Sequence, residues 1–332
     1  MWFEKLLGFK EENPDQVRSN LLLENGYLVS GINGKSYKYG NLEIPTLRQL
    51  KQSAGAIDNY KGKLTVSEVV ADVQKLHMDP ANRGAMFQVA SQFNLLEMVS
   101  PGVSPERGVD GYENDRTQGP ACAIACGAGT IYRNYFVPLG NQMGQTRDLQ
   151  IDCLDEIGKA LRNEELLLWK MQNGYALASK AGLIHVQEQI KKMDPQSYEK
   201  LMVQLKVGIQ WDTEVTISKD KSTVSQVYCS ALPVAYSEVP SVYWEEFAKL
   251  ILNATYEAAF YAALINFERT GNPRLYLTLV GGGAFGNELE WIFSAIGNAI
   301  NKFQNTPIDV RIVSYGCSNP AIRRFIDDGA YE

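Results

Sequence analysis

The sequence has few histidines, no long apolar run and no excess of basic residues. Only two of its 332 residues are histidine, His77 and His185, so a zinc site built on histidine is not expected. No apolar segment approaches the length that a transmembrane helix needs. Lysine and arginine number 32 against 38 aspartates and glutamates, which gives a net charge of −6. That balance lacks the positive surface with which proteins bind nucleic acid or an anionic membrane, so we expect neither partner.

The five cysteines are too irregularly spaced for a disulfide framework. An odd number of thiols without regular spacing is typical of a reducing compartment, and the first twelve residues lack the apolar core of a signal peptide. We therefore expect a cytoplasmic protein. Cys122 and Cys126 are four residues apart in a run of small side chains, a spacing that favours core packing on a helix over half of a metal site. We expect no metal and no cofactor.

Composition and length predict an ordinary globular protein. Hydrophobic residues make up 45% of the chain and charged residues 21%, and the length suits one large α/β domain or two smaller ones. Residues 1–62 are mixed and turn-rich and are predicted to form an N-terminal cap. Residues 63–332 are predicted to form the main domain, which has an insertion around residues 140–220.

Apolar periodicity is clearest in the last third of the chain. Strands are predicted at 225–235, 274–280 and 308–315, and helices at 244–267 and 288–303. This order of strand, helix, strand, helix and strand with short connections predicts parallel neighbours covered by helices on both faces. Upstream, the pattern predicts helices at 65–76, 121–132, 148–170 and 187–205, and strands at 85–94, 174–179 and 205–217.

A glycine-rich turn lies between the strand predicted at 274–280 and the helix that follows it. The turn reads Gly281-Gly282-Gly283-Ala284-Phe285-Gly286-Asn287. Such a turn leaves backbone N–H groups uncovered at the positive end of a helix dipole, which suits a phosphate. Three glycines in a row cost conformational entropy that a plain tight turn does not require. The turn therefore favours an anion site over a purely structural turn.

Two common phosphate-binding motifs fit this turn poorly. Gly281, Gly283 and Gly286 have the spacing of a dinucleotide fingerprint, but the strand that follows ends at Tyr315 without the acidic residue that binds ribose in Rossmann domains. A kinase-type loop would need Lys-Ser or Lys-Thr after the glycines. A Rossmann-type NAD(P)-dependent oxidoreductase stays open as the less favoured alternative.

A second segment completes a pattern found in a known superfamily. A strand ending in Asn94 is followed by a Gly- and Asp-rich loop over residues 100–119 and then by a helix of small residues. Joined to Leu-Val-Gly-Gly-Gly-Ala-Phe-Gly-Asn at 279–287, this order resembles the macrodomain superfamily. The glycine-rich turn is most similar to that of the poly(ADP-ribose) glycohydrolase branch. The run from Tyr112 to Ala121 is most similar to that of the MavL-like ADP-ribosylhydrolases within it.

The resemblance covers roughly residues 65–135 and 225–318 and implies a fold, a ligand and a set of binding residues. The implied fold is a three-layer α/β/α arrangement around a mixed sheet, and the implied ligand is ADP-ribose on modified protein. In that family the glycine-rich loop wraps the diphosphate, and the asparagine lies beside the distal ribose. The implied ADP-ribose-binding residues are Asn94, Glu97, Glu113, Thr117, Gln118, Gly281, Gly282, Gly283, Ala284, Phe285, Gly286 and Asn287.

Five acidic residues follow Asn94 within a short stretch. They are Glu97, Glu106, Asp110, Glu113 and Asp115. Cleavage of an ADP-ribosyl bond passes through an oxocarbenium-like transition state, which a carboxylate assists by protonating the leaving group or orienting water. Neighbouring carboxylates raise one another's pKa, which suits a general acid. Asp115 is the first catalytic candidate because it is predicted to begin the small-residue helix, and Asp110 and Glu106 are the next candidates.

We therefore predict an ADP-ribosyl hydrolase that acts on ADP-ribosylated protein without metal or cofactor. The glycohydrolase signature of three glycines followed by paired glutamates is missing from the first loop, so the family's catalytic carboxylate does not transfer to one residue. A non-catalytic ADP-ribose reader is the alternative from another class, because it would keep the phosphate loop and use the acids for binding only. The linkage, the target protein and the oligomeric state are left open.

Overall fold

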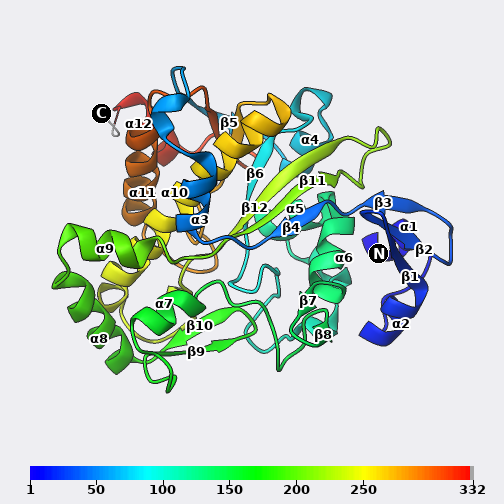
Figure 1. The fold of residues 1–332 in the computed structure, drawn as a ribbon, viewed down its shortest axis with the longest axis horizontal. Coiled ribbons are helices and arrows are strands. Elements are labelled where there is room, and N and C mark those ends of the chain that lie inside the picture. The colour runs from blue at the N-terminus through cyan, green and yellow to red at the C-terminus, as the bar shows by residue number, and fades with distance from the viewer. Residues whose placement is uncertain (330–332) are drawn as a thin grey trace.

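A seven-stranded mixed sheet forms the centre of the computed structural model, which describes residues 1–329 (Figure 1). Its strands, in spatial order, are β4 (Asn41–Glu43), β11 (Gly208–Glu214), β12 (Thr223–Cys229), β6 (Met86–Ala90), β13 (Arg274–Leu277), β14 (Asp309–Ser314) and β5 (Thr65–Val70). The five strands from β12 to β5 run parallel; β11 pairs antiparallel with β12, and β4 pairs antiparallel with β11. The carboxyl ends of the five parallel strands therefore meet at one edge of the sheet.

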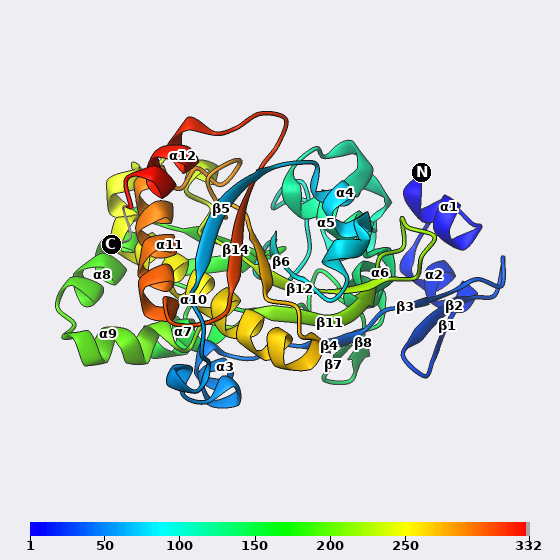
Figure 2. The same cartoon turned by 90° about the horizontal axis from the view of Figure 1, so that it is seen from above.

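Helices cover both faces of this sheet, as Figure 2 shows from above. One face carries α10 and α11 with α3, and the other carries α4, α5 and α6. Their bounds are α3 (Leu47–Ala54), α4 (Val73–Met78), α5 (Gln118–Ala125), α6 (Gly127–Tyr135), α10 (Glu245–Thr270) and α11 (Leu289–Phe303), and α12 (Pro320–Asp327) follows β14. The three-layer α/β/α architecture with a mixed sheet, predicted from the sequence, is confirmed.

The long helix α10 is the centre of the hydrophobic core. Most of its side chains between Phe247 and Asn266 are buried, since it packs on the sheet, on α11 and on α3 at once. A helix that is apolar on all sides is stable only when neighbours surround it. It ends at Gly271, whose φ of 74° is the left-handed conformation that glycine adopts without a side-chain penalty.

The N-terminal part packs against α6 and against the loop over residues 100–119 (the acidic loop). It comprises α1 (Trp2–Leu7), α2 (Pro14–Asn20), β1 (Leu21–Glu24), β2 (Tyr27–Ser30) and β3 (Ser36–Lys38). Phe3 and Leu7 share an apolar cluster with Val109, Tyr112 and Tyr135. The division at residue 62 stays a prediction; within residues 1–62 the structure places β4 in the central sheet and α3 on α10.

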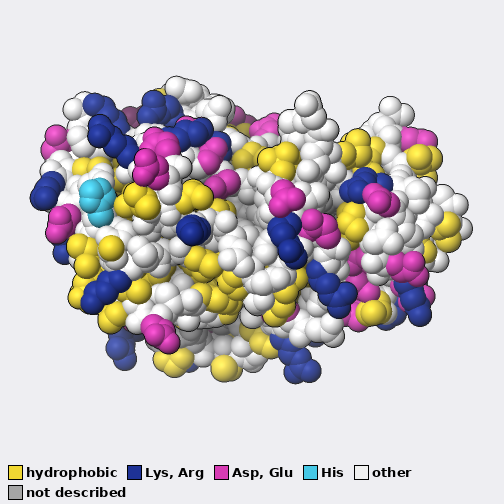
Figure 3. Space-filling view, turned by 90° about the horizontal axis from the view of Figure 1, so that it is seen from below, with side chains coloured by type: hydrophobic (Ala, Val, Ile, Leu, Met, Phe, Trp, Pro, Cys, Tyr) yellow, Lys and Arg dark blue, Asp and Glu magenta, His cyan; other side chains and the backbone are white. Residues whose placement is uncertain are grey.

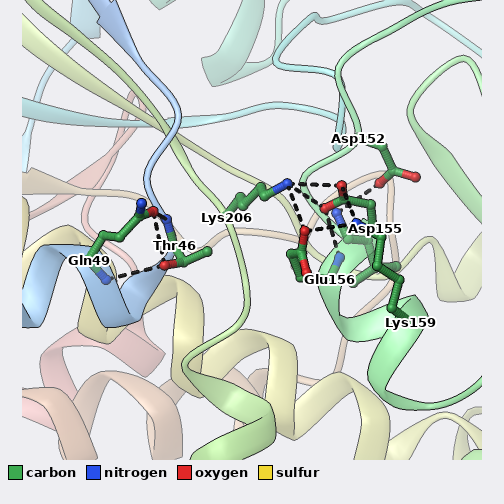
Figure 4. Close-up of polar contacts among 8 residues, drawn as sticks. Thr46, Gln49, Asp152, Asp155, Glu156, Lys159 and Lys206 are labelled. Carbon is green, nitrogen blue, oxygen red and sulfur yellow. Dashed lines mark hydrogen bonds and ion pairs between the residues drawn. The ribbon is translucent and has the colours of Figure 1, made fainter.

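Residues 138–202 lie mostly outside the central sheet. They form β7 (Pro138–Leu139), β8 (Gln142–Met143), α7 (Asp155–Ala160), β9 (Trp169–Gln172), β10 (Tyr175–Ala178), α8 (Lys180–Lys191) and α9 (Pro195–Met202). Figure 4 shows the ion pairs that Lys206, just before β11, makes with α7 of this segment. Its ammonium lies 2.7 Å from Asp155 Oδ1 and 3.6 Å from Glu156 Oε1, and its backbone bridges Thr46 at the start of α3.

The helix predicted at 65–76 is wrong in its first half. Residues 65–70 form β5, which pairs with β14 along its whole length, from Thr65 opposite Asp309 to Val70 opposite Ser314. Helical spacing of the valines was misleading because β-branched residues suit an edge strand equally well. The helix α4 begins only at Val73, where the Asp72 side chain accepts a hydrogen bond of 2.8 Å from the Gln74 amide.

Other predicted elements exist with different bounds. The helix predicted at 148–170 is wrong over most of its length, because only 155–160 are helical and β9 begins at 169. The helix predicted at 121–132 begins at Gln118 and is interrupted at Cys126, whose φ of −114° and ψ of 55° are not helical. The helix predicted at 187–205 is the end of α8 and the whole of α9.

The surface carries charges of both signs, and four of the five cysteines are buried. On the face drawn in Figure 3, side chains of both charges lie interspersed with apolar ones. Among residues 1–329, no helix is long and apolar enough to cross a membrane. All five cysteines are free thiols; Cys122 and Cys126 are buried in the core, as predicted, and Cys317 is exposed.

Candidate functional site

The candidate site lies where the parallel strands end. Ala90 at the end of β6 stands opposite Cys229 at the end of β12, and β13 ends beside them at Leu277. The loop after β6, the loop after β12 and the glycine-rich loop after β13 therefore leave the sheet side by side. Loops at the carboxyl edge of parallel strands are the usual place for a ligand in α/β proteins.

The glycine-rich loop offers unpaired amides. The strand β13 stops at Leu277 rather than at residue 280 as predicted, since the Val280 amide donates to the Tyr256 hydroxyl at 2.9 Å instead of continuing the ladder. Within the described residues, the amides of Gly283, Ala284 and Phe285 donate no hydrogen bond. Successive N–H groups without protein acceptors form the kind of concave donor group that holds phosphate oxygens.

Two glycines of this loop are required by the fold itself. Gly281 and Gly286 have φ values of 80° and 68°, and a β-carbon on either would lie within 2.7 Å of an alanine β-carbon, that of Ala231 or Ala235. Asn287 precedes the helix α11, which begins at Leu289 rather than at the predicted residue 288. The side-chain amide group of Asn287 donates to the Leu232 carbonyl at 2.8 Å and so anchors the loop.

The loop after β6 folds back on itself before it reaches Glu97. The Gln92 backbone amide donates to the Leu96 carbonyl at 2.9 Å, and the Gln92 side-chain oxygen accepts from the Met98 amide at 2.8 Å. Leu95 has a φ of 64°, a conformation that a branched side chain rarely adopts. Local strain of this kind is held in place only where the surrounding structure fixes it, and it is common at functional sites.

Glu97 is a buried carboxylate without a hydrogen-bond partner. Its side chain is 4% exposed, and neither carboxylate oxygen has a partner among the described residues. Burial raises the pKa of Glu97 to about 8, against the opposing effects of the Arg133 charge and of the nearby Tyr112 hydroxyl. The nearby Asp115 carboxylate raises the pKa further. A carboxyl group in this state is protonated near neutral pH and can act as a general acid.

Arg133 supplies a fixed positive charge behind Glu97. Its guanidinium is fully buried, lies 3.6 Å from the centre of the Tyr228 ring and donates to the Leu95 carbonyl at 3.1 Å. No carboxylate of the described chain lies within ion-pair distance of it. A buried charge without a counter-ion is costly, so this cation stabilises any negative charge that forms on Glu97.

Two cavities meet at Glu97. The first, of about 340 Å³, lies between the glycine-rich loop, the end of β6 and the start of α5. The second, of about 540 Å³, lies between the acidic loop and the N-terminal segment. Four residues line both cavities: Glu97, Met98, Val99 and Asp115. The two carboxylates therefore lie on the walls of both cavities.

Asp115 and Thr117 form the rim of the first cavity. Asp115 follows the short 3-10 helix η4 (Asp110–Asn114), and α5 begins three residues later. Its Oδ1 atom accepts from the Thr117 amide at 2.8 Å and from the Thr117 hydroxyl at 2.7 Å. Asp115 therefore precedes the small-residue helix instead of beginning it, and its second carboxylate oxygen is left for other contacts.

Of the other acidic candidates, only Asp110 lines a cavity. Asp110 lines the second cavity with its Oδ1 atom unpartnered among the described residues, and burial raises its pKa. Glu113 is exposed and accepts from the Trp2 amide at 2.8 Å. Glu106 lines neither cavity; burial alone would raise its pKa, but hydrogen bonds from Ser104 and from the Arg147 amide outweigh burial and lower it.

Asn94 and Gln118 fix the loop that leads to the site. Asn94 is fully buried outside both cavities, where its amide group donates to Gln150 Oε1 at 2.8 Å. Gln118 lines the first cavity while its side chain binds both the Ala90 amide and the Gln88 carbonyl. In the same cavity lie Gly281, Gly283, Ala284 and Phe285, whereas Gly282, Gly286 and Asn287 do not line it.

Two tyrosines of the first cavity were not found from the sequence. Tyr175 on β10 and Tyr236 in the loop after β12 pack with Phe285, with ring centres 5.0 to 5.5 Å apart. The Tyr175 hydroxyl donates to the Met98 carbonyl at 2.7 Å. Both residues come from segments whose sequence patterns carry no chemical motif, so only the folded chain brings them to the site.

A metal centre is not among the arrangements found. In residues 1–329, no group of three or more His, Cys, Asp and Glu side chains is placed to hold a metal ion. His77 is fully buried and its Nδ1 atom lies 2.7 Å from the Val73 carbonyl oxygen. Burial lowers the pKa of His77 to about 4, so this imidazole is a neutral part of the core.

No protein-family model and no curated protein sequence matches the chain. Among solved structures, poly(ADP-ribose) glycohydrolase from Deinococcus radiodurans in complex with ADP-ribose is 9% identical, with a TM-score of 0.46 over 88% of this chain and 96% of that chain. The glycohydrolase from Thermomonospora curvata is 11% identical, with a TM-score of 0.45 over 96% of this chain and 97% of that chain. Its complex with the inhibitor ADP-HPD gives a TM-score of 0.43 at 11% identity, over 96% and 97% of the two chains.

Proposed function

We propose that the protein is an ADP-ribosyl hydrolase that releases ADP-ribose from modified protein. The observation that carries this proposal is Glu97, a buried carboxyl group without a hydrogen-bond partner in the described chain, whose pKa is raised to about 8. A protein gains no stability from such a group. Perturbed carboxylates of this kind are typical of catalytic sites when they line a cavity.

The first cavity suits the diphosphate and ribose of ADP-ribose. Its volume of about 340 Å³ falls in the range of small-molecule sites. The unpaired amides of Gly283, Ala284 and Phe285 supply the donors that a diphosphate requires without a basic side chain. The rings of Phe285, Tyr175 and Tyr236 supply an apolar surface on which a ribose can pack.

The two carboxylates divide the chemistry between them. Protonated Glu97 would donate its proton to the leaving atom while the bond from that atom to the anomeric carbon breaks. Asp115 would stabilise the oxocarbenium-like transition state and take the proton of the water that forms the new carbon–oxygen bond. The products are ADP-ribose and the unmodified side chain. The second cavity, on the far side of Glu97, would receive the leaving side chain.

The test compares wild type with Glu97→Gln on mono- and poly-ADP-ribosylated proteins, with release of ADP-ribose measured by mass spectrometry. We expect turnover to fall at least a hundredfold, since an amide cannot supply the proton. The Kd for ADP-ribose, measured by calorimetry, should stay within about tenfold. Glu24→Gln, on an exposed strand end, is the matched control and should behave as wild type.

Other outcomes would identify the alternatives. Tight ADP-ribose binding without release by wild type would show a reader module. If the wild type does not bind ADP-ribose, the proposed function is wrong. If it also changes the absorbance of NAD(P)H, it is an oxidoreductase.

We also include a cytoplasmic location without nucleic-acid or membrane partners in the proposal. It is supported by five free thiols and a net charge of −6. Cell fractionation would test it.

A further inference from the structure

Glu11 joins the N-terminal segment to the acidic loop. Its Oε1 atom accepts from the Val109 amide at 3.0 Å and from the Tyr135 hydroxyl at 2.7 Å. Its Oε2 atom accepts from the Asp110 amide at 2.6 Å. One carboxylate thus binds two successive backbone amides that lie 98 and 99 positions further along the chain.

Those two amides are the start of η4. Val109 is its N-cap residue and provides no side-chain cap of its own. The first amides of a helix need an acceptor, and a carboxylate at that end also complements the helix dipole. Glu11 therefore acts as the cap of η4 from a distant part of the sequence. Gly108 makes this approach possible, because a β-carbon there would lie 2.4 Å from Glu11 Oε2.

The capped helix leads directly to both carboxylates of the proposed mechanism. The Tyr112 hydroxyl, in the middle of η4, accepts from the Glu97 amide at 3.0 Å. The Asp115 amide, at its end, donates to the Tyr112 carbonyl at 3.1 Å. A shift of η4 would therefore move the backbone of Glu97 and Asp115 together.

We propose that Glu11 is a positioning residue that caps η4 and thereby holds Glu97 and Asp115 in register with each other. This inference rests on the proposed function. It assigns a role in turnover to the N-terminal segment, which lies outside the part of the chain that the sequence resemblance covers. The glycine-rich loop connects β13 and α11 and is separate from η4. A change at Glu11 should therefore lower turnover without weakening the binding of the diphosphate.

The test measures kcat for ADP-ribose release and Kd for ADP-ribose in Glu11→Gln. Glutamine keeps one acceptor oxygen but turns an NH2 group toward the Asp110 amide, so the cap is half removed. We expect kcat to fall at least tenfold and Kd to change less than threefold. Glu12→Gln is the matched control, because Glu12 is exposed and its side chain has no partner among the described residues. It should match wild type in both values.

A second variant guards against misfolding. Tyr135→Phe removes only the hydroxyl that orients Glu11, and we expect a smaller loss in kcat, of about threefold, again at unchanged Kd. Hydrogen exchange of the Val109 and Asp110 amides should become faster in both variants and stay unchanged in Glu12→Gln.

The outcomes separate the two proposals. If Glu11→Gln retains wild-type kcat, or loses kcat and ADP-ribose affinity equally, the positioning role is overturned while the hydrolase remains. If wild type binds no ADP-ribose or releases none, the proposed function fails and the positioning role fails with it.

Discussion

Gly119 lies directly against Glu97. A β-carbon at position 119 would come within 3.1 Å of Glu97 Cγ and within 2.0 Å of the Ala90 carbonyl oxygen. The missing side chain is what allows α5 to begin at the end of β6, with the carboxylate of Glu97 beside its first turn. Packing this close transmits any change of volume to the neighbouring side chain.

We expect Gly119→Ala to displace either the first turn of α5 or the side chain of Glu97. Overpacking of this kind costs about 1–3 kcal/mol of stability, and ADP-ribose release should fall at least tenfold. Gly102→Ala is the matched control, because the nearest atom to its added carbon is 3.7 Å away. Urea unfolding and turnover measured on both variants check this prediction. Equal turnover in the two would contradict it.

Glu97 should reduce the stability of the protein at alkaline pH. Its folded pKa of about 8 lies above the ordinary value of 4.5, so the unfolded chain releases this proton at lower pH than the folded chain does. Stability is therefore lost as pH rises from about 4.5 to about 8, by as much as about 5 kcal/mol, since each pKa unit corresponds to about 1.4 kcal/mol.

Glu97→Gln removes this titration and should therefore be more stable than wild type above pH 8, by about 1–4 kcal/mol. Near pH 4.5 the two proteins should differ little from this cause. The measurement is the free energy of unfolding in urea at pH 5, 7 and 9. A difference that stays constant across these values would mean that the Glu97 carboxyl titrates normally in the folded protein.

Asp115→Asn should separate turnover from binding. Asparagine keeps the side-chain oxygen that accepts from the Thr117 amide and hydroxyl, so the rim of the first cavity should hold its shape. The negative charge is lost, and with it the stabilisation of the oxocarbenium-like transition state. We expect turnover to fall at least a hundredfold and the Kd for ADP-ribose to stay within about tenfold. Wild-type turnover would leave Glu97 as the only essential carboxylate.

Much of the fold follows from periodicity, because the strongest patterns belong to elements with a buried face in the core. The predicted order of strand, helix, strand, helix and strand is β12, α10, β13, α11 and β14. The pattern failed at the sheet edge, where Thr65–Val70 pairs with only one neighbour and its valines are half exposed. A strand of that kind has no burial pattern that distinguishes it from a helix.

Only the part of the site that lies in one continuous sequence motif could be predicted from the sequence. The run of glycines in the glycine-rich turn indicates its unpaired amides directly from the sequence. The sequence predicts Glu97 only as a binding residue and not as the general acid. Its burial depends on Tyr112, Arg133 and Gly119, and no sequence motif links these residues to Glu97. Tyr175 and Glu11 reach the site through long-range packing alone.

The glycines of the 281–286 loop should divide into a structural and a binding class. A β-carbon on Gly283 meets no atom within 4 Å, whereas one on Gly286 would lie 2.7 Å from Ala235 Cβ at a φ of 68°. Gly283→Val should therefore fold as wild type and lose ADP-ribose binding at least a hundredfold, because the backbone amides can no longer approach the diphosphate. Gly286→Ala should lower the stability by about 1–3 kcal/mol instead. Calorimetry and thermal unfolding on the two variants test the division, and a Gly283→Val protein that binds ADP-ribose normally would place the diphosphate elsewhere.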